Sequence, residues 1–393
     1  METENENIIY LKEEFYMKKF LLGLLFSSMV ALTACAPASE PTQEATDVAE
    51  ETTESETRTV TDQNGDEIVL PNEINRVVIT SPWPLPSVYG LYMGSGERIV
   101  GIHPAAQGAA ENSLLMRIAP EIAEAETGFI NGTEINIEEL MKLEPDVVFY
   151  PAGNDEQKAA LANAGIPAVA FSTSIAQFNT VETVNRWVEL LGEIFGDEVK
   201  ADEITAYGRD IENMILERIK DIPEEEKPRA LIMYHYKDDN MQTSGAKHFG
   251  QYWLDMAGAI NVAGDQDAGG VPISMEQINE WNPDILFVTN FSPYLVEDFY
   301  KNAIEGDDWS SIKAVQDEKV FKYPLGMYRW YPPSSDSPLT LLWLVKQVHP
   351  DLFKDIDLEQ EIRDYYTRFY NLELTDEDIV TMMNPPREAA DGV

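Results

Sequence analysis

The sequence has a single cysteine, Cys35, and few basic residues. One cysteine excludes an intramolecular disulfide. The 393 residues include 28 Lys and Arg against 70 Asp and Glu, for a formal net charge of −42 at pH 7. So acidic a surface repels nucleic acid and anionic lipid headgroups, which argues against a nucleic-acid-binding function. No stretch reaches the roughly 18 consecutive apolar residues that a transmembrane helix requires.

The signatures of common enzymes are also missing. The sequence contains no Gly-x-Ser-x-Gly elbow, no His-Glu-x-x-His pair and no Walker A loop. Nothing therefore supports a cell-surface enzyme, and we expect no catalysis and no intrinsic cofactor.

The N-terminal region carries the features of an export signal. Lys18 and Lys19 precede an apolar stretch over residues 20–34, and Cys35 follows directly. A short basic region, an apolar core and small residues before the cleavage site are typical of a signal peptide. The tetrapeptide Leu-Thr-Ala-Cys resembles the lipobox of bacterial lipoproteins, in which the cysteine receives a diacylglycerol. We therefore expect export and a lipid anchor at Cys35, which places the protein on the outer side of the cytoplasmic membrane.

Two flanking segments are not expected to take part in the fold. Residues 1–16 precede the signal and have the character of an upstream extension from a misassigned start. Between residues 36 and 57 there is no Lys, Arg or aromatic residue, and Val48 is the one large aliphatic. Such a composition cannot bury enough apolar surface to fold. We predict a disordered acidic tether over residues 35–57.

The remaining sequence alternates strand and helix patterns. Two short strand patterns flank Asn64-Gly65, which is a strong hairpin signal. Apolar runs at residues 146–150 and 166–171 enclose a helical pattern, as in a βαβ unit with parallel strands. Similar runs recur at residues 230–234 and 284–288. Residues from about 177 to 220 have helical spacing and no proline, which predicts a helix-rich bridge between two α/β lobes.

An internal repeat supports two related lobes. Residues 135–149 align without gaps on residues 273–287, with identical Ile, Glu, Pro, Asp and Phe at matching positions. N-cap residue types with Glu or Gln three positions later predict a capping box at each helix start. The repeated Glu138 and Glu276 are not used by that box and are free to point outward, although the helix dipole alone favours a carboxylate there.

Together these segments resemble the substrate-binding proteins of ABC importers for ferric siderophores, haem, cobalamin and related metal complexes. The resemblance runs from about residue 58 to residue 380. It rests on the opening hairpin with residues 76–78, on residues 98–102, on both copies of the repeat, on residues 243–245 with 257–263, and on a late helix near residues 343–353. No single motif is specific, but their order and spacing are.

The resemblance implies a fold of class α/β: two Rossmann-like lobes with central, mostly parallel sheets, joined by a long linker helix. Hinge motion in such proteins is limited, and the ligand lies in the cleft between the lobes. The expected domains are 1–34 extension and signal peptide, 35–57 tether, 58–176 N-terminal lobe, 177–221 helical linker, 222–350 C-terminal lobe and 351–393 C-terminal helical extension.

In this family, ligand contacts follow the ends of the strands, where this sequence is rich in aromatic residues. Aromatic walls suit a flat or apolar chelate, and Arg329 offers a bidentate fork to a carboxylate or phosphate. The predicted ligand-binding residues are Trp83, His103, Tyr150, His235, His248, Tyr294, Tyr328, Arg329 and Trp330.

Several alternatives stay open. Trp330 and Tyr331 are equally suited to packing between the lobes. Histidines 103, 235 and 248 are metal ligands by type, but they lack close His and carboxylate spacing. We favour an iron complex, with the metal already wrapped in its chelator, over a corrinoid or a free divalent cation.

The partners also follow from the resemblance. One glutamate on each lobe docks on the permease in this family, and the matching positions are Glu138 and Glu276. The expected partners are the ABC permease with its ATPase, a small metal chelate and the membrane through the lipid anchor. We expect a monomer.

Overall fold

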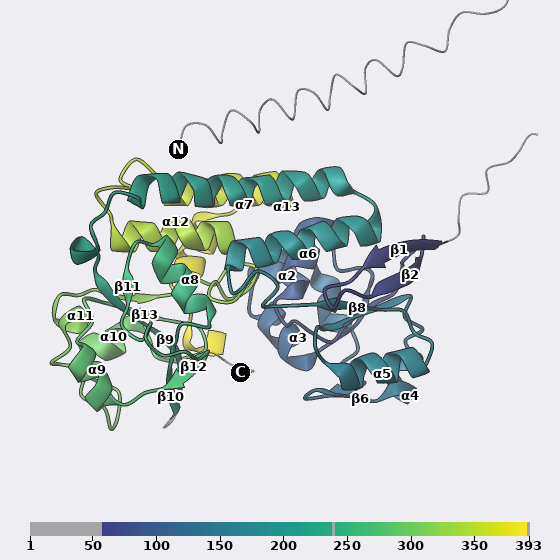
Figure 1. Cartoon of the computed structure of the whole chain (residues 1–393), viewed down its shortest axis with the longest axis horizontal. Coiled ribbons are helices and arrows are strands. Elements are labelled where there is room, and N and C mark those ends of the chain that lie inside the picture. The colour runs from purple at the N-terminus through teal and green to yellow at the C-terminus, as the bar shows by residue number, and fades with distance from the viewer. Residues whose placement is uncertain (1–56, 238–239, 391–393) are drawn as a thin grey trace, which may run out of the picture. The chain divides into compact units, whose positions relative to one another are not determined.

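The computed structural model describes residues 57–237 and 240–390, all within one unit, Glu54–Val393. The signal peptide, Cys35 and nearly all of the tether lie outside the described residues and stay predictions. Figure 1 shows an N-terminal lobe in blue, a C-terminal lobe in green, and helices that run along one side of both.

The first element is the predicted hairpin. Strands β1 (Thr57–Thr61) and β2 (Glu67–Pro71) pair antiparallel, with Val60 opposite Ile68. The Asn-Gly pair lies inside a longer loop, in which Gly65 has a φ of +85°. The Asp62 carboxylate accepts hydrogen bonds from the loop amides of residues 64 and 66, at 2.9 and 3.0 Å. The loop is therefore held by a side chain rather than closed as a two-residue turn.

The N-terminal lobe is built on a fully parallel sheet with the order β4-β3-β7-β8. Its strands are β3 (Val77–Ile79), β4 (Ile99–Ile102), β7 (Val147–Pro151) and β8 (Ala168–Phe171). The helices and short strands around it are α2 (Leu85–Met93), α3 (Pro104–Glu111), η1 (Leu114–Arg117), η2 (Pro120–Glu124), β5 (Ile130–Asn131), β6 (Glu134–Ile135), α4 (Ile137–Met141) and α5 (Asp155–Asn163). The predicted βαβ unit is confirmed by β7, α5 and β8.

The bridge consists of two helices rather than one uninterrupted stretch. Helix α6 (Thr180–Phe195) ends at Gly196, which adopts a φ of +84°, and Asp197 then caps α7 (Glu198–Ile219). Glycine is favoured in this left-handed conformation because it has no Cβ. The 22-residue α7 is the long linker helix, and Figure 1 shows it passing along both lobes.

The C-terminal lobe contains a mixed sheet with the order β12-β10-β9-β13-β14, and β11 also pairs with β9. Strands β9, β11, β13 and β14 are parallel, whereas β10 runs antiparallel to β9 and β12. The bounds are β9 (Arg229–Lys237), β10 (Asn240–Ser244), β11 (Ile260–Asn261), β12 (Gly270–Pro272), β13 (Ile285–Val288) and β14 (Val320–Lys322).

Short helices surround this sheet and longer ones follow it. They are η3 (Glu224–Glu226), α8 (Phe249–Met256), α9 (Met275–Trp281), α10 (Val296–Tyr300), α11 (Lys313–Gln316), α12 (Ser337–Val348), α13 (Leu358–Tyr370), α14 (Asp376–Met383) and η4 (Arg387–Ala390). The late helix predicted near residues 343–353 is α12. It begins six residues earlier and ends five residues earlier than expected. Pro338 is compatible with the early start, because a proline in the first turn needs no hydrogen-bonding amide.

The two repeated helices are α4 and α9, one on each lobe. Asn136 and Ser274 cap them as predicted, with side chains that accept from the amides of residues 139 and 277. The second half of the predicted box is not formed in α4. The Asn136 amide donates instead to the Phe129 carbonyl at 2.8 Å, and the Glu139 carboxylate pairs with Lys142 at 2.6 Å. The repeat therefore has a local structural basis in its caps.

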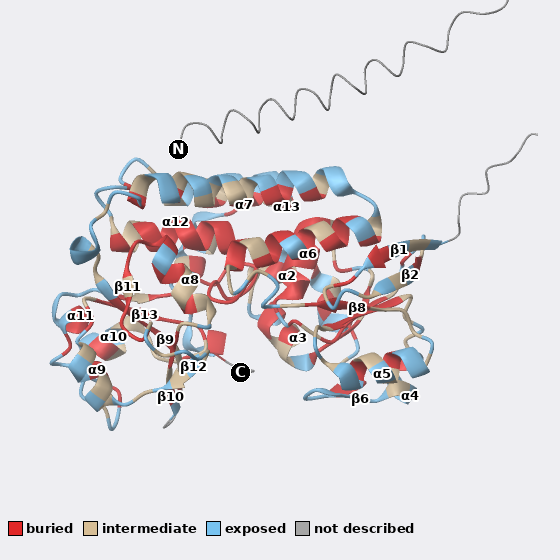
Figure 2. Ribbon diagram, viewed as in Figure 1, coloured by how far each residue is buried: buried red, intermediate tan, exposed pale blue. Residues whose placement is uncertain are grey.

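One hydrophobic cluster extends through both lobes and the bridge. It joins Val77 and Phe149 of the first sheet, Trp187 of α6, and Ile232 and Phe287 of the second sheet, all at most 1% exposed. Figure 2 shows α12 buried along most of its length, whereas α7 exposes an outer face. The two lobes thus share a core, which restricts how far they can move apart.

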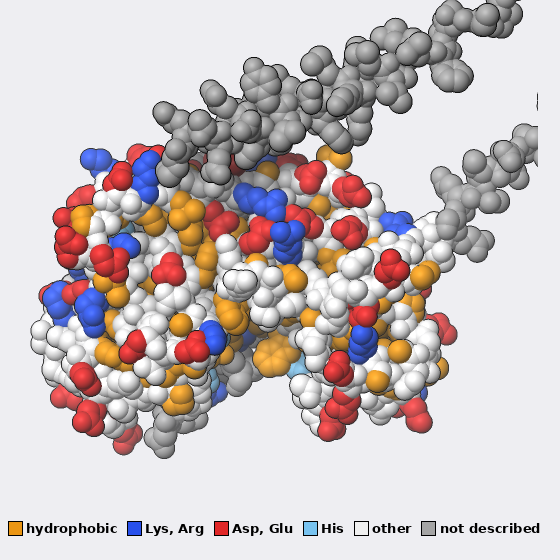
Figure 3. All heavy atoms as spheres, viewed as in Figure 1, with side chains coloured by type: hydrophobic (Ala, Val, Ile, Leu, Met, Phe, Trp, Pro, Cys, Tyr) orange, Lys and Arg blue, Asp and Glu red, His pale blue; other side chains and the backbone are white. Residues whose placement is uncertain are grey.

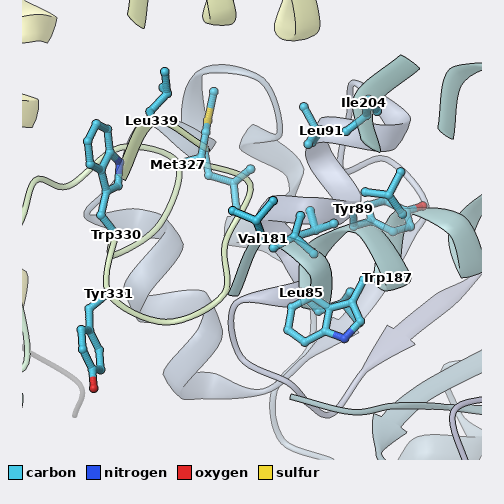
Figure 4. Packing of buried hydrophobic residues seen from close by; sticks show 14 of the residues in the cluster. Leu85, Tyr89, Leu91, Val181, Trp187, Ile204, Met327, Trp330, Tyr331 and Leu339 are labelled. Carbon is cyan, nitrogen blue, oxygen red and sulfur yellow. The ribbon is translucent and has the colours of Figure 1, made fainter. Parts of the chain in front are cut away.

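The close-up in Figure 4 shows part of this shared core. Met327 and Leu339 of the C-terminal half lie on one side, and Leu85, Tyr89 and Trp187 lie on the other. Burying each such side chain contributes about 1.5–3 kcal/mol to stability. The junction of the lobes is therefore an apolar interior rather than a flexible joint.

A buried carboxylate, Asp336, organises the loop before α12. Its side chain accepts hydrogen bonds from the Met327 amide (2.7 Å), the Trp330 indole (3.1 Å) and the Tyr366 hydroxyl (3.0 Å). Gly326 allows this packing, since a Cβ there would lie 2.2 Å from the carboxylate. Burial raises the pKa of Asp336 to about 6.

Replacing Asp336 by alanine should lower the free energy of unfolding by about 3 kcal/mol or more, because three buried donors lose their acceptor. Urea or thermal unfolding of the purified variant measures this. The matched control is Asp336→Asn, whose oxygen accepts from Met327 and Trp330 while its amide donates to Tyr366. We expect the control to stay within about 1 kcal/mol of the wild type. Equal losses in both variants would contradict the assigned role.

Candidate functional site: the edge where the strands end

The carboxyl ends of the parallel strands point toward the junction of the lobes. The helices after β3 and β4 contact the loop before α12, since the Leu114 amide donates to the Gly326 carbonyl (2.9 Å) and the Ser113 hydroxyl to that of Met327 (3.1 Å). Ligands of open α/β sheets bind outside the carboxyl ends of the strands. Figure 3 shows a hollow between the lobes at this position, with hydrophobic and histidine side chains in it.

In the N-terminal lobe, Trp83 and His103 are the candidate site residues. Trp83 follows β3 and is 40% exposed, and its ring lies 5.0 Å from that of His103, at an interplanar angle of 31°. His103 follows β4 and caps α3, with Pro104 at the first helical position. The structure thus brings together two residues that the sequence separates by twenty positions.

Both ring nitrogens of His103 are engaged by the main chain. The Ala105 amide donates to Nδ1 at 3.0 Å, so Nε2 carries the proton and lies 3.1 Å from the Gly132 carbonyl. Burial lowers the pKa of His103, which keeps the ring neutral. Metal coordination by either nitrogen would break one of these hydrogen bonds, so the geometry favours a supporting role beneath Trp83.

In the C-terminal lobe, an aromatic group lies where β9, β10 and β13 end. Its ring centroids are 4.7 Å apart for Tyr234 and His248, 5.6 Å for Tyr234 and Phe291, and 5.5 Å for Tyr234 and Tyr331. Phe249 lies 4.9 Å from His248. We call these five residues the aromatic wall. It presents ring faces and edges with few charges.

Hydrogen bonds fix His248 within this wall. Its Nδ1 lies 2.9 Å from the Ser244 hydroxyl and 2.5 Å from the Tyr331 hydroxyl, and these two hydroxyls also contact each other. Burial lowers the pKa of His248 to about 4. The imidazole is therefore neutral under ordinary conditions and contributes an aromatic surface rather than a charge.

Arg329 lies behind the aromatic wall. It is 3% exposed, and its guanidinium carbon lies 5.1 Å from the Phe291 ring centroid and 5.6 Å from that of Tyr328. Its Nε and Nη2 donate to the Ala389 carbonyl at 3.2 and 3.0 Å. The positive charge is thus stacked on aromatic faces and aimed by the C-terminal segment.

Other predicted ligand residues lie elsewhere. Trp330 is fully buried and donates to Asp336, so it takes the packing alternative. Tyr150 is 1% exposed and accepts from Asn64 of the hairpin loop at 3.0 Å. Tyr294 lies 4.6 Å from Tyr236 and packs against a separate buried hydrophobic cluster of the C-terminal lobe, to which Tyr236 belongs. These positions give each side chain a structural partner.

Two predictions from the strand ends are only partly matched. Tyr328 is buried, with its hydroxyl 3.4 Å from Arg329, so it supports the guanidinium rather than the hollow. His235 lies on β9 opposite Gln242 of β10 and is half-buried. Its neighbour Tyr234 belongs to the aromatic wall instead, since adjacent strand residues face opposite sides of a sheet. Of the five residues of the aromatic wall, only His248 is among the nine predicted ligand residues; the other four are Tyr234, Phe249, Phe291 and Tyr331.

The two predicted docking glutamates are exposed, and each lies in the first turn of its helix, Glu138 in α4 and Glu276 in α9. Figure 1 shows α4 and α9 on different lobes, both on the side away from α7. Such positions leave each carboxylate available to a partner protein.

The sequence of residues 77–325 matches the model of the periplasmic binding protein family. A solved structure of a periplasmic solute-binding protein from Veillonella parvula is 33% identical, with a TM-score of 0.76, over 84% of this chain and 97% of that one. The chain belongs to the periplasmic binding protein family.

Named relatives agree with this assignment. The molybdate-binding protein MolA of Haemophilus influenzae is 27% identical over 331 residues, covering 80% of this chain and 91% of MolA. Its structure with bound molybdate gives a TM-score of 0.68 at 26% identity, over 81% of this chain and 99% of that one. The uncharacterized ABC transporter substrate-binding lipoprotein YvrC of Bacillus subtilis is 24% identical over 76% of this chain and 87% of its own length.

This periplasmic binding protein is therefore a substrate-binding component of an ABC transporter. Proteins of this class lie outside the cytoplasm, bind small ligands and work with a permease and its ATPase. Its relatives are solute-binding proteins, which supports the prediction of a non-enzymatic role. The two-lobed α/β fold expected from the sequence is confirmed by the solved relatives.

Two features are absent from the described part of the chain. None of its helices is long and apolar enough to cross a membrane. Within residues 57–237 and 240–390, no three His, Cys, Asp or Glu side chains are grouped so as to hold a metal ion.

We expect His248 to remain neutral from pH 8 down to about pH 5, because burial places its pKa near 4. The chemical shift of its Cε1 proton, assigned with a His248→Gln variant, should stay constant over that range. In urea the same proton should titrate near the ordinary value of about 6.5. A folded-state midpoint above pH 6 would contradict the buried environment.

Proposed function

We propose that this binding protein captures an iron complex, such as a siderophore or haem, and delivers it to its permease. The observation that carries the proposal is the presence of an aromatic surface at the strand ends of each lobe, Trp83 on one and the aromatic wall on the other. A chelate or tetrapyrrole exposes flat or apolar ligand groups around its metal, and such groups stack on aromatic rings.

The charge of the site fits a chelate with acidic groups. Arg329 places a cation behind Phe291, and a guanidinium is well suited to carboxylates and phosphates. His103 and His248 are neutral, and their engaged nitrogens favour a metal already enclosed by its own ligands. A free divalent cation is a weaker candidate for this reason, and a corrinoid remains an alternative chelate.

A second candidate ligand is an oxyanion such as molybdate. The similarity to MolA over most of both chains supports it. An oxyanion is held by several N–H and O–H donors, and here Arg329 and the hydroxyls of Ser244 and Tyr331 lie near the aromatic wall. The two candidates differ in how much they need the exposed Trp83 ring.

We expect Trp83→Ala to weaken binding of a ferric chelate about tenfold or more, because the ring loses its stacking partner. Trp83→Phe should retain most of the affinity. The probes are a ferric catecholate, a ferric hydroxamate, haem, cobalamin and sodium molybdate, each titrated by calorimetry and intrinsic fluorescence.

The control variant is Leu352→Ala, an apolar side chain of similar exposure, 39%, in the turn after α12. It should bind like the wild type. Binding of molybdate alone, unaffected by Trp83→Ala, would select the second candidate. A lack of response to every probe would refute both.

We also propose that Glu138 and Glu276 dock on the permease, and that Cys35 holds the monomeric protein at the membrane by a lipid. Support comes from the exposure of both glutamates on separate lobes, from the lipobox-like sequence before Cys35, and from the similarity to a lipoprotein of Bacillus subtilis.

Reversing both charges, with Glu138→Lys and Glu276→Lys, should abolish uptake of the bound probe by vesicles containing the permease and ATPase. Ligand affinity should not change, since neither carboxylate lies among the residues of the site. The control is Glu225→Lys, a charge reversal of another exposed glutamate, in η3, which should leave uptake intact. A loss of ligand affinity in the double variant would assign the two glutamates to the fold instead.

A further inference from the structure

We propose that the C-terminal segment Asp376–Ala390 is a strap that positions Phe291 of the aromatic wall and the Arg329 guanidinium behind it. The proposal rests on the proposed site, but its first test requires no ligand. The strap comprises α14, η4 and the turn between them.

One end of the strap contacts the N-terminal lobe. Arg117 in η1 donates to the Asp378 carboxylate of α14 at 2.9 Å. Asp378 also accepts from the Thr375 amide and hydroxyl, both at 2.8 Å, which fixes its side chain at the start of α14. The ion pair therefore links the lobe that carries Trp83 to the C-terminal strap.

The rest of the strap is bound to loops that follow C-terminal-lobe strands. The Leu325 amide, after β14, donates to the Met382 carbonyl at 2.9 Å. Arg387 forms a two-pronged pair with Asp298, at 2.7 and 2.8 Å, and donates to the Pro293 carbonyl at 3.2 Å. Paired hydrogen bonds of this type are directional as well as strong, so Arg387 fixes the position of the strap relative to the loop after β13.

The last described residues reach the guanidinium of Arg329. Ala389 and Ala390 are 3% and 2% exposed, and the Ala389 carbonyl accepts both Nε–H and Nη2–H of Arg329. A single carbonyl that accepts two donors fixes the plane of the guanidinium. The guanidinium carbon lies 5.1 Å from the Phe291 ring centroid, and Phe291 belongs to the same loop whose Pro293 carbonyl accepts from Arg387.

A buried lysine also fixes the loop after β13. The buried Lys322 ammonium donates to the Thr289, Ser292 and Tyr294 carbonyls at 2.9, 2.5 and 3.1 Å. Lys322 therefore fixes the loop to its own sheet, whereas Arg387 connects it to the strap. Because Arg387 and the Ala389 carbonyl link the strap to this loop and to Arg329, movement of the strap is transmitted to Phe291 and Arg329. Arg387 is thus a positioning residue for the proposed ligand site.

The first test is hydrogen–deuterium exchange on the ligand-free protein. Arg387→Ala should speed exchange about tenfold in residues 291–298 and 326–331, because the strap no longer holds them. Arg117→Ala should produce a smaller change in residues 326–331, through the far end of the strap. The matched control is Arg218→Ala, which removes another two-pronged pair, with Asp355 at 2.7 and 2.8 Å. It should leave both regions unchanged.

The second test is affinity for the ferric hydroxamate and molybdate probes. Arg387→Ala should weaken whichever probe binds about tenfold, while its melting temperature falls no more than that of Arg218→Ala. The charge exchange Arg387→Asp with Asp298→Arg should restore slow exchange and affinity. Faster exchange in residues 384–390 alone, with residues 291–298 and 326–331 unchanged, would overturn the proposal. Changed exchange with no binding of any probe would instead count against the proposed ligands.

Discussion

The buried carboxylate of Asp336 is the constraint on which the conformation of the loop before α12 depends. It gathers the Met327 amide, the Trp330 indole and the Tyr366 hydroxyl around one point, and Gly326 leaves the space for it. Isolated buried charges are costly, which is why burial raises the pKa of this carboxyl. The cost is offset by hydrogen bonds that give an otherwise irregular loop one conformation.

The same loop lies where the two lobes meet, so the order that Asp336 imposes extends beyond its own lobe. The loop contacts the helices after β3 and β4, and it joins a hydrophobic cluster that continues into both sheets. Two lobes with one continuous core cannot separate without exposing apolar surface to water. We therefore expect ligand capture to involve small adjustments of loops and rotamers more than wide opening.

Local signals account for what the sequence predicted correctly. The Asn64-Gly65 hairpin, the βαβ unit and the two repeated helix caps each depend on residues close together in the chain. The residues of the candidate site were harder to predict, because neighbours in the chain face opposite sides. Tyr331 lies in the aromatic wall, whereas Trp330 points to Asp336. Arg329 meets a carbonyl 60 residues away, a pairing that no local pattern encodes. The helix start at His103 was predictable from the sequence, since Pro104 is favoured at the first position of a helix.

The position of Arg329 also reconciles a cationic site with a chain of net charge −42. Exposed acidic groups farther than about 8 Å are screened by physiological salt, whereas a guanidinium sandwiched between Phe291 and Tyr328 is shielded from solvent. Its field is therefore strongest at short range, toward whatever rests on the aromatic wall. The acidic surface disfavours nonspecific adsorption to anionic lipid. In the proposed site, ligand selectivity would depend on how the loops after β13 and β14 aim that one side chain.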